Sequence, residues 1–183
     1  MAAQTLTATL DKVAEWVERT VAPKLKYLVP PDDSAVVDIE PRWDNPSVFQ
    51  AFVPPVERLP DGAHQAPSIA VQLINGLDGL KNSRELAIRI VLTIWAPGQF
   101  VNGEFTRDSD GWRDLFNGLG VIAGAVESAD TIADCAVDLT AGVQFGFYEI
   151  DKEIPDLYPY WMGKVDFKLR RGTHLSKRFE GML

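Results

Sequence analysis

The sequence predicts an α+β fold: a four-stranded, mostly antiparallel sheet flanked by two helices, with a proline-rich loop or arm inserted. Apolar residues recur at helical spacing in two segments, and in four others they alternate with less apolar residues, as in half-buried strands. Between Leu28 and Pro67, eight prolines interrupt each apolar run before it becomes long. This distribution predicts helices and a sheet, with an irregular segment between the first helix and the first long strand.

The composition predicts one domain spanning residues 1–183 with a substantial core, since 46% of the residues are hydrophobic. The net charge of -8 argues against a general nucleic-acid-binding surface, because phosphate contacts need clustered lysine and arginine. Cys135 is the only cysteine, so no intramolecular disulfide can form and a reducing cytoplasm fits. We expect neither a standard secretion signal nor a membrane span, because no apolar run approaches roughly 18 residues.

The first helix is expected at about residues 7–21 and is ended by Pro23. Its apolar residues recur at helical spacing, while charged residues occupy the remaining surface. The apolar stripe consists of Leu6, Leu10, Val13, Val17 and Val21. Such a stripe must cover another element, which we expect to be the sheet.

The proline-rich segment 28–67 predicts ordered loop with two short strands, at 35–40 and 48–53. A loop of this length inside a compact domain is uncommon and often carries function. We interpret it as a projecting arm that contacts a neighbour. The alternative is an irregular surface insertion.

The strongest local evidence for a sheet lies between residues 69 and 95. Two alternating apolar runs, 69–73 and 86–94, are separated by the turn-forming pairs Asn75-Gly76 and Asp78-Gly79. These runs are predicted to pair as an antiparallel hairpin. Residues 99–107 are turn-prone and polar, and we expect them to form a loop.

A second helix is expected after Asp108, Ser109 or Asp110, each of which can cap its N-terminus. Its apolar stripe consists of Trp112, Leu115, Phe116, Leu119, Ile122, Ala123 and Val126. Glycines at 118, 120 and 124 each cost up to about 1 kcal/mol of helix propensity relative to alanine. We interpret them as places of close packing against the sheet.

The last two predicted strands lie on either side of an aromatic segment. Val143, Phe145 and Phe147 mark the third strand, and the fourth has Val165, Phe167 and Leu169 on one face. The aromatic segment between them contains Tyr158, Pro159, Tyr160, Trp161 and Gly163. Proline fixes its own φ and favours an extended preceding residue, so the rings are held rigidly. We interpret the segment as a structural brace or an interface; closure of the core is the alternative.

No motif predicts a catalytic, cofactor-binding or metal site. The glycines from Gly118 to Gly124 have one residue too many for a dinucleotide fingerprint and follow a helical run. His64 and His174 lack cysteine, histidine or carboxylate neighbours at metal-ligand spacing. Carboxylates at 38 and 40, and at 151, 153 and 156, have no fold-level reason to converge as an acid-base pair. We therefore expect no enzyme and no cofactor.

Basic residues gather near the C-terminus, although the chain as a whole is acidic. Arg170, Arg171, Lys177 and Arg178 lie in the basic tail 170–183, just after Lys164 and Lys168. We expect these four residues to contact an acidic protein face, such as the body of a second copy of this chain. A solvated strand face with a loose tail is the alternative.

From about Pro67 to Leu169 the chain resembles the tail terminator (tail completion) proteins of long-tailed bacteriophages. The order of elements carries part of this resemblance, together with the sequence Asp-Gly-Trp-Arg-Asp-Leu at 110–115. The most specific part is Tyr158-Pro159-Tyr160-Trp161, followed by Gly163 and an alternating strand. The segment 28–67, the glycine-rich second helix and the tail beyond Arg171 do not contribute to it.

The resemblance implies a small subunit that forms a hexameric ring on the head-proximal end of a finished tail tube. Such a ring stops tube polymerisation and offers the surface that docks onto the neck of a filled capsid. The implied partners are further copies of this chain, the tail tube protein and a neck or head-completion protein. DNA would pass through without specific binding. The implied location is the tail-neck junction of the virion, with host cytoplasm during assembly and no membrane.

Other functions remain open from the residues alone. Within virion proteins, a head-closure or adaptor protein is the nearest alternative. A small enzyme would use the carboxylates near 151–156 beside the aromatic segment as a ligand cleft. A sugar-binding or peptide-binding module would use the rings of 158–161 as a stacking platform.

Overall fold

The computed structural model describes residues 6–31, 42–78, 83–101 and 104–172. Within these ranges there are two α-helices, α1 (Leu6–Thr20) and α2 (Gly111–Glu127). Short 3-10 helices are η1 (Ala22–Lys24), η2 (Val56–Arg58) and η3 (Leu139–Ala141). The strands are β1 (Tyr27–Leu28), β2 (Trp43–Asp44), β3 (Ser47–Gln50), β4 (Ser68–Asp78), β5 (Ser83–Trp95), β6 (Gly98–Val101), β7 (Glu104–Arg107), β8 (Thr131–Ile132), β9 (Cys135–Val137), β10 (Gln144–Phe147) and β11 (Tyr160–Gly172).

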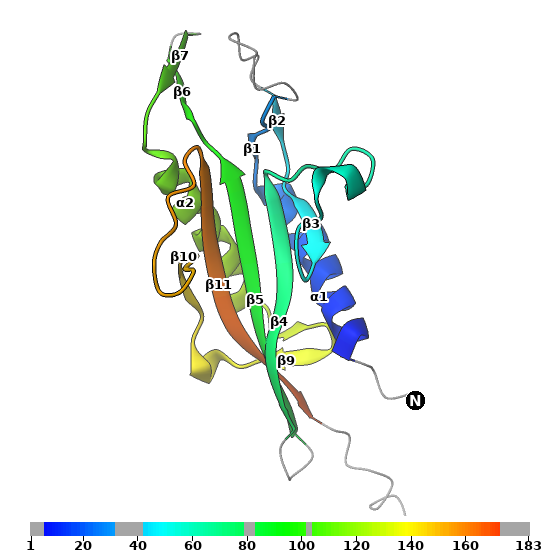
Figure 1. Cartoon of the computed structure of the whole chain (residues 1–183). Coiled ribbons are helices and arrows are strands. Elements are labelled where there is room, and N and C mark those ends of the chain that lie inside the picture. The colour runs from blue at the N-terminus through cyan, green and yellow to red at the C-terminus, as the bar shows by residue number, and fades with distance from the viewer. Residues whose placement is uncertain (1–5, 32–41, 79–82, 102–103, 173–183) are drawn as a thin grey trace, which may run out of the picture.

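A seven-stranded mixed sheet forms the body of the protein and curls into a half-barrel (Figure 1). Its strand order is β3-β4-β5-β11-β9-β8, and β10 also pairs with β11. Only the β3–β4 pair is parallel among the described strands of this sheet. Strands β5 and β11 pair along their whole length, from Trp95 opposite Tyr160 to Ser83 opposite Gly172.

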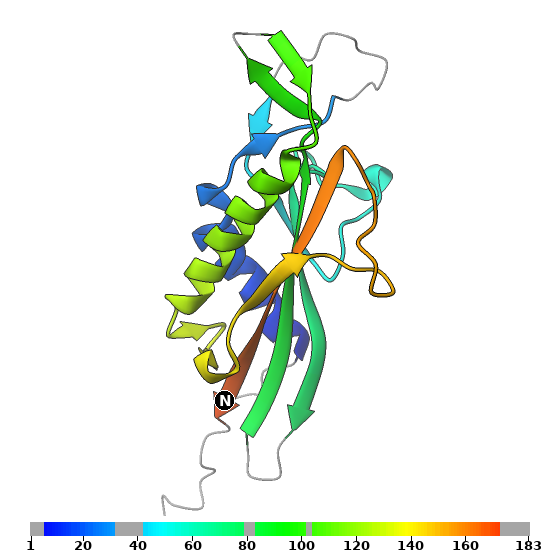
Figure 2. The same ribbon diagram turned by 90° about the vertical axis from the view of Figure 1, so that its left-hand side faces the viewer.

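The predicted fold class is wrong in the number of strands and in the placement of the helices. The four predicted strands correspond to β4, β5, β10 and β11, but β3, β8 and β9 join the same sheet. These additional strands contain four, two and three residues, which is too short for a clear alternating pattern. Both helices lie on one face of the sheet, so they do not flank it (Figure 2).

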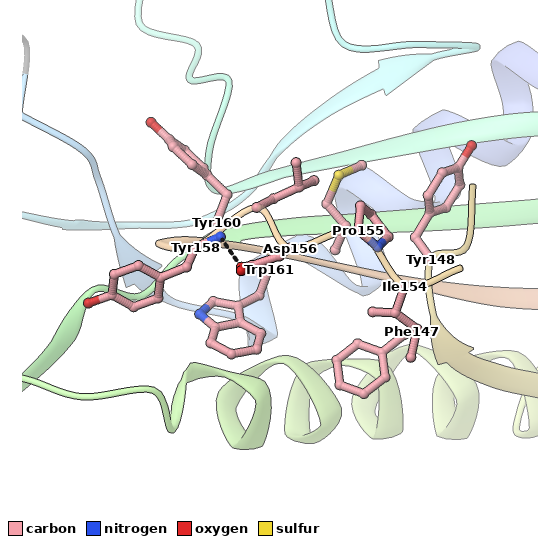
Figure 3. A pocket seen from close by; sticks show the side chains of 10 residues that line it. Phe147, Tyr148, Ile154, Pro155, Asp156, Tyr158, Tyr160 and Trp161 are labelled. Atoms are coloured by element: carbon pink, nitrogen blue, oxygen red, sulfur yellow. Dashed lines mark hydrogen bonds between the residues drawn. The ribbon is translucent and has the colours of Figure 1, made fainter. Parts of the chain in front are cut away.

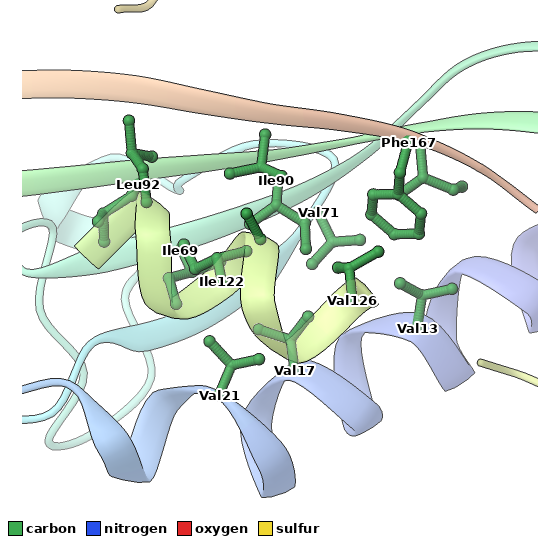
Figure 4. Packing of buried hydrophobic residues seen from close by; sticks show 14 of the residues in the cluster. Val13, Val17, Val21, Ile69, Val71, Ile90, Leu92, Ile122, Val126 and Phe167 are labelled. Carbon is green, nitrogen blue, oxygen red and sulfur yellow. The ribbon is translucent and has the colours of Figure 1, made fainter. Parts of the chain in front are cut away.

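The core lies between this sheet face and the two helices (Figure 4). The apolar stripes predicted for both helices supply most of its helical side. The described residues that are fully buried in this core are Val13, Val17 and Val21 from α1 and its end, Leu115, Leu119, Ile122 and Val126 from α2, and Ile69, Val71, Ile90, Leu92, Ile94, Val165 and Leu169 from the sheet. Burial of each such side chain stabilises the fold by about 1.5–3 kcal/mol. The apolar stripes of the helices therefore face the apolar side of the sheet.

The glycines of α2 differ in what surrounds them. At Gly118 an added Cβ would collide with the hydroxyl of Tyr27 and lie 2.7 Å from Leu92 Cδ2. At Gly120 and Gly124 it would meet nothing within 4 Å. The predicted close packing is therefore right for Gly118 and wrong for Gly120 and Gly124, which lie on the outer surface of the helix layer.

Two further predicted segments differ from the structure. Residues 99–107, predicted as a loop, form most of the β6–β7 hairpin, which projects from one end of the body (Figure 1). Strand β4 continues through Asn75 and Gly76, with a register shift after Leu73, so this pair does not make the predicted turn. The strand predicted at 35–40 lies outside the described residues, and the one predicted at 48–53 corresponds to β3.

Candidate functional site

The aromatic segment lies where β5, β11 and α2 meet. The Ala96 amide donates to the Pro159 carbonyl at 3.0 Å, and the Trp161 indole Nε1 donates to the Ala96 carbonyl at 3.2 Å. The Tyr158 hydroxyl donates to the Pro97 carbonyl at 2.7 Å. Because Gly98 begins β6, these hydrogen bonds fix the base of the projecting hairpin to the start of β11.

Two glycines allow the helix to approach this segment. A Cβ on Gly111, the first residue of α2, would lie 2.7 Å from Ala96 Cβ and 2.8 Å from Trp161 Cδ1. A Cβ on Gly163 would lie 2.7 Å from Leu119 Cδ1. Real Cβ contacts are not this short, so both positions depend on glycine for close packing rather than for an unusual φ.

A pocket of about 240 Å³ opens beside the segment (Figure 3). It is lined by Phe147, Tyr148, Ile154, Pro155, Asp156, Leu157, Tyr158, Tyr160, Trp161 and Met162. Asp156 is the one carboxylate among them, and its Oδ1 accepts a hydrogen bond from the Tyr158 amide at 3.3 Å. Asp151 and Glu153 are not part of the lining, so the converging carboxylates that an acid-base mechanism needs are not formed at this pocket.

The rings of the segment divide between the core and the surface. Tyr158 and Tyr160 are 46% and 40% exposed, whereas Trp161 is half-buried and packs against the main core. Below the pocket, Phe147 contacts Phe116 of α2 edge-to-face with ring centroids 5.0 Å apart. The pocket therefore has a rigid aromatic floor and an apolar, solvent-exposed rim.

Three cations of β11 are paired within the described part of the chain. Lys164 lies 3.5 Å from Glu149, Lys168 lies 2.5 Å from Glu85, and Arg170 Nη2 lies 2.8 Å from Asp138 Oδ2. The predicted contact residue Arg170 thus already has an acidic partner. The side chain of Arg171 and the whole of Lys177 and Arg178 lie outside the described residues.

Among the acidic residues that the structure describes, Asp138 is the most buried. Its side chain is 3% exposed, and its Oδ1 accepts hydrogen bonds from the Thr140 hydroxyl at 2.6 Å and the Thr140 amide at 3.2 Å. The Thr140 hydroxyl and the nearby Arg170 guanidinium lower the pKa of this carboxyl. Asp138 therefore joins η3 to the end of β11 in its ionised form.

A second polar cluster fixes the end of the proline-rich segment. His64 Nε2 lies 3.0 Å from Asp44 Oδ2, and the His64 amide donates to Ser47 Oγ at 2.9 Å. The hydrogen bond with His64 lowers the pKa of Asp44. The serine hydroxyl thus contacts the histidine backbone and not its ring, so these three residues are not arranged as a nucleophilic triad.

No group of three or more histidine, cysteine, aspartate or glutamate residues in the described part of the chain can hold a metal ion. His174 lies outside that part. Among the described helices, none is both long and apolar enough to cross a membrane. No protein-family model matches the chain, and the search among curated proteins finds no match either.

Sequence reasoning identified the aromatic segment but missed several residues that build the site. Ile154 and Leu157 line the pocket, although nothing in their local sequence distinguishes them from other loop residues. Asp110 precedes α2 as predicted, but its side chain makes no capping hydrogen bond, and nothing in the local sequence shows that Gly111 lies against Ala96 and Trp161. Asp138 has no local signal either, since its partner Arg170 is far away in the sequence.

Proposed function

We propose that this protein is the tail terminator of a long-tailed bacteriophage. In this function, copies of the chain form a ring, expected to be hexameric, on the head-proximal end of the tail tube. The ring stops tube polymerisation and provides the surface for joining to the head. The protein would act in the host cytoplasm during assembly and remain at the tail-neck junction of the virion.

The observation that carries the proposal is the aromatic segment of the resemblance together with its position. Tyr158, Pro159 and Trp161 hold the base of the β6–β7 hairpin through three hydrogen bonds. A rigid body with a projecting hairpin suits a subunit that must present a fixed surface to a second ring. The paired cations of β11 and the single carboxylate of the pocket give no support to a catalytic function.

The charge of the chain agrees with a ring through which DNA passes. A net charge of -8 disfavours retention of DNA on the wall of such a bore, because phosphates are repelled by carboxylates. The expected binding partners are those that the resemblance implies: the neck and tube proteins and other copies of the chain.

Capping of tail tubes tests the proposal directly. Tube protein from the same phage should be polymerised with and without the purified chain, and tube lengths measured by negative-stain electron microscopy. The expected result is a shorter, narrower length distribution with added density at one tube end. Tubes of unchanged length with bare ends, together with a strictly monomeric protein at high concentration, would rule out the tail terminator function.

The same experiment distinguishes a tail terminator from the nearest alternative, a head-closure or adaptor protein. A head-closure or adaptor protein would bind isolated heads or neck assemblies and leave growing tubes uncapped. Binding to both structures would favour the tail terminator, since it must contact each of them.

The pocket of about 240 Å³ favours a ligand-binding module as a second candidate function. Exposed Tyr158 and Tyr160 offer ring faces to a sugar or an aromatic peptide. Saturation-transfer NMR with oligosaccharide and aromatic peptide panels should then detect binding that Tyr160→Ala removes. The absence of binding across both panels would exclude this candidate.

A further inference from the structure

Exposed apolar side chains lie on two opposite edges of the molecule. On one edge, the loop between β10 and β11 exposes Ile154 at 59% beside the aromatic pocket. On the other, the residues after β3 expose Phe52 at 67%. In Figure 1 the β10–β11 loop and the segment after β3 lie on opposite sides of the sheet. Ile150, Leu157, Tyr158 and Tyr160 are also exposed on the first edge and Val56 on the second, and exposed apolar residues in such groups indicate surfaces that contact another protein.

The pocket has room for one aromatic ring. An apolar cavity of about 150 Å³ is large enough to bind benzene. The pocket beside the aromatic segment measures about 240 Å³ and has a mostly apolar lining (Figure 3). A phenylalanine side chain from a neighbouring molecule would therefore fit with space to spare.

Phe52 is held in place by the backbone around it although its ring is exposed. Ala51 has a left-handed φ of 65°, and the Phe52 amide donates to the Gln50 carbonyl at 2.8 Å. The Ala51 amide donates to the Val71 carbonyl at 2.8 Å, and Gln72 Nε2 donates to the Ala51 carbonyl at 2.9 Å. Two hydrogen bonds, one through the Ala51 amide and one through its carbonyl, thus attach the turn to β4. An aromatic side chain on such a fixed turn loses little conformational freedom when it binds.

Charge determines which edge faces the pocket. Residues 149–156 carry four carboxylates and one lysine, so two pocket edges brought together would repel each other. The charged residues at positions 42–61 are Arg42, Asp44, Glu57, Arg58 and Asp61, two positive and three negative, so the Phe52 edge is less acidic than the pocket rim. An acidic rim therefore meets this edge with less repulsion than a second acidic rim would bring.

We propose that Phe52 of one copy inserts into the aromatic pocket of the next copy, in a head-to-tail contact. The inference rests on the proposed ring function and identifies the subunit interface of that ring. The Ala51 amide bonds to the Val71 carbonyl, and Val71 of β4 is opposite Ile90 of β5, which is opposite Val165 of β11. The pocket residue Phe147 is opposite Gly163, two residues from Val165 along β11. Two residues along a strand correspond to about 7 Å, so the ring and the pocket lie at similar heights. A head-to-tail contact of this kind closes into a ring when its rotation permits.

Cross-linking with single introduced cysteines tests the contact in the full-length protein. Cys135 is buried, so the introduced thiols are the reactive ones. Val53→Cys and Ile154→Cys proteins, both of which keep the Phe52 ring, should be prepared separately, mixed under assembly conditions with tail tubes, and treated with a short bismaleimide. We expect a cross-linked dimer in the mixture and not in either protein alone. Leu139→Cys, which lies in η3 before β10 and is 54% exposed, replaces Ile154→Cys as the matched control and should give no cross-link.

Loss of the aromatic ring provides the second measurement. Phe52 is exposed, so Phe52→Ala should fold normally, as checked by circular dichroism, and weaken association about 10-fold to 30-fold or more, as expected for a central aromatic anchor. Leu139→Ala should leave association unchanged.

The outcomes separate this inference from the function on which it rests. Three results would each overturn the interface and leave the tail terminator function in place: capped tubes without a 53–154 cross-link, a cross-link between two Ile154→Cys copies, or normal association of Phe52→Ala. Cross-linking of Ile154→Cys to the tube protein would assign the pocket to that partner instead. A chain that stays monomeric at every concentration and in the presence of tubes would overturn both.

Discussion

Gly118→Ala is the sharpest test of how α2 packs on the sheet. A methyl group at this position would collide with the Tyr27 hydroxyl and lie 2.7 Å from Leu92 Cδ2. The methyl end of Leu92 can rotate, but the rigid Tyr27 ring is buried and its hydroxyl donates weakly to the Asp114 carbonyl at 3.4 Å. The helix or the ring must therefore move, which disturbs the core on both sides.

The expected magnitude follows from two opposing effects. Replacing glycine by alanine inside a helix gains up to about 1 kcal/mol of propensity. Overpacking a well-filled core typically costs about 1–3 kcal/mol. Gly124→Ala provides the matched control, because its methyl group would meet nothing within 4 Å and only the gain applies. The two variants should thus differ by about 1–3 kcal/mol, with Gly118→Ala the less stable.

Urea unfolding followed by circular dichroism measures this difference, and a second substitution identifies its cause. Tyr27→Phe removes the hydroxyl that the new methyl group meets, so it should recover part of the stability lost in Gly118→Ala. The two changes should therefore be coupled in a double-mutant cycle. Equal stability of the Gly118→Ala and Gly124→Ala proteins would refute the close packing of Gly118.

Three further predictions concern the aromatic segment and Asp138. Trp161→Ala should cost about 3–5 kcal/mol and lower the yield of folded protein, measured by solubility and urea midpoint; an unchanged midpoint would contradict its packing on the core. Gly163→Ala should cost about 1–3 kcal/mol because its methyl group meets Leu119, and a neutral effect would show that this leucine can move away. The pKa of Asp138 is lowered in the folded protein, so the unfolded chain binds more protons in acid. The stability from Asp138 is therefore present above about pH 4 and lost as pH falls through the folded pKa. Asp138→Asn should flatten this acid decline in thermal unfolding, and an unaltered slope would assign the decline to other carboxylates.

The long elements of the fold could be predicted from the sequence because their patterns are long. The stripe Val13, Val17 and Val21 and the alternation of Leu86, Ile88 and Ile90 each repeat often enough to identify a helix and a strand. The β4–β5 hairpin was predicted for the same reason. Most residues predicted to face inward are buried, but Leu6 and Trp112 of the helix stripes are 42% and 38% exposed, and Leu73 of β4 is only partly buried.

Strands β8 and β9, and the place of β3 in the sheet, could not be predicted because they depend on backbone pairing and not on side-chain pattern. Strand β3, predicted at 48–53, joins the sheet because its four residues pair in parallel with Ser68 to Val71 of β4, a partner that follows a proline-rich loop. Strand β9 exists since Ala136 and Val137 reach β11 after the end of α2. Whether both helices share one face is likewise a property of the chain crossovers, which periodicity does not report.

The charged residues near the C-terminus show a related difficulty. Alternation correctly places Lys164, Lys168 and Arg170 on the face of β11 opposite the core. It does not reveal that Glu149, Glu85 and Asp138 lie beside them. A run of cations in the sequence therefore indicates a free basic surface only when the neighbouring strands carry no carboxylates at matching positions.

The aromatic segment contributes both to folding and to the exposed surface, because adjacent residues of a strand point to opposite faces of the sheet. Trp161 lies on the same face of β11 as Gly163, Val165 and Phe167, so it points toward the helices, where its indole N–H donates to the Ala96 carbonyl. Tyr160 lies on the opposite face and is exposed. Substitutions at the two positions should therefore separate stability from association. Trp161→Ala should lower the stability of the fold, whereas Tyr160→Ala should weaken binding of the molecule that enters the pocket. A sequence motif of consecutive aromatic residues in a strand is for this reason better interpreted one residue at a time than as a single unit.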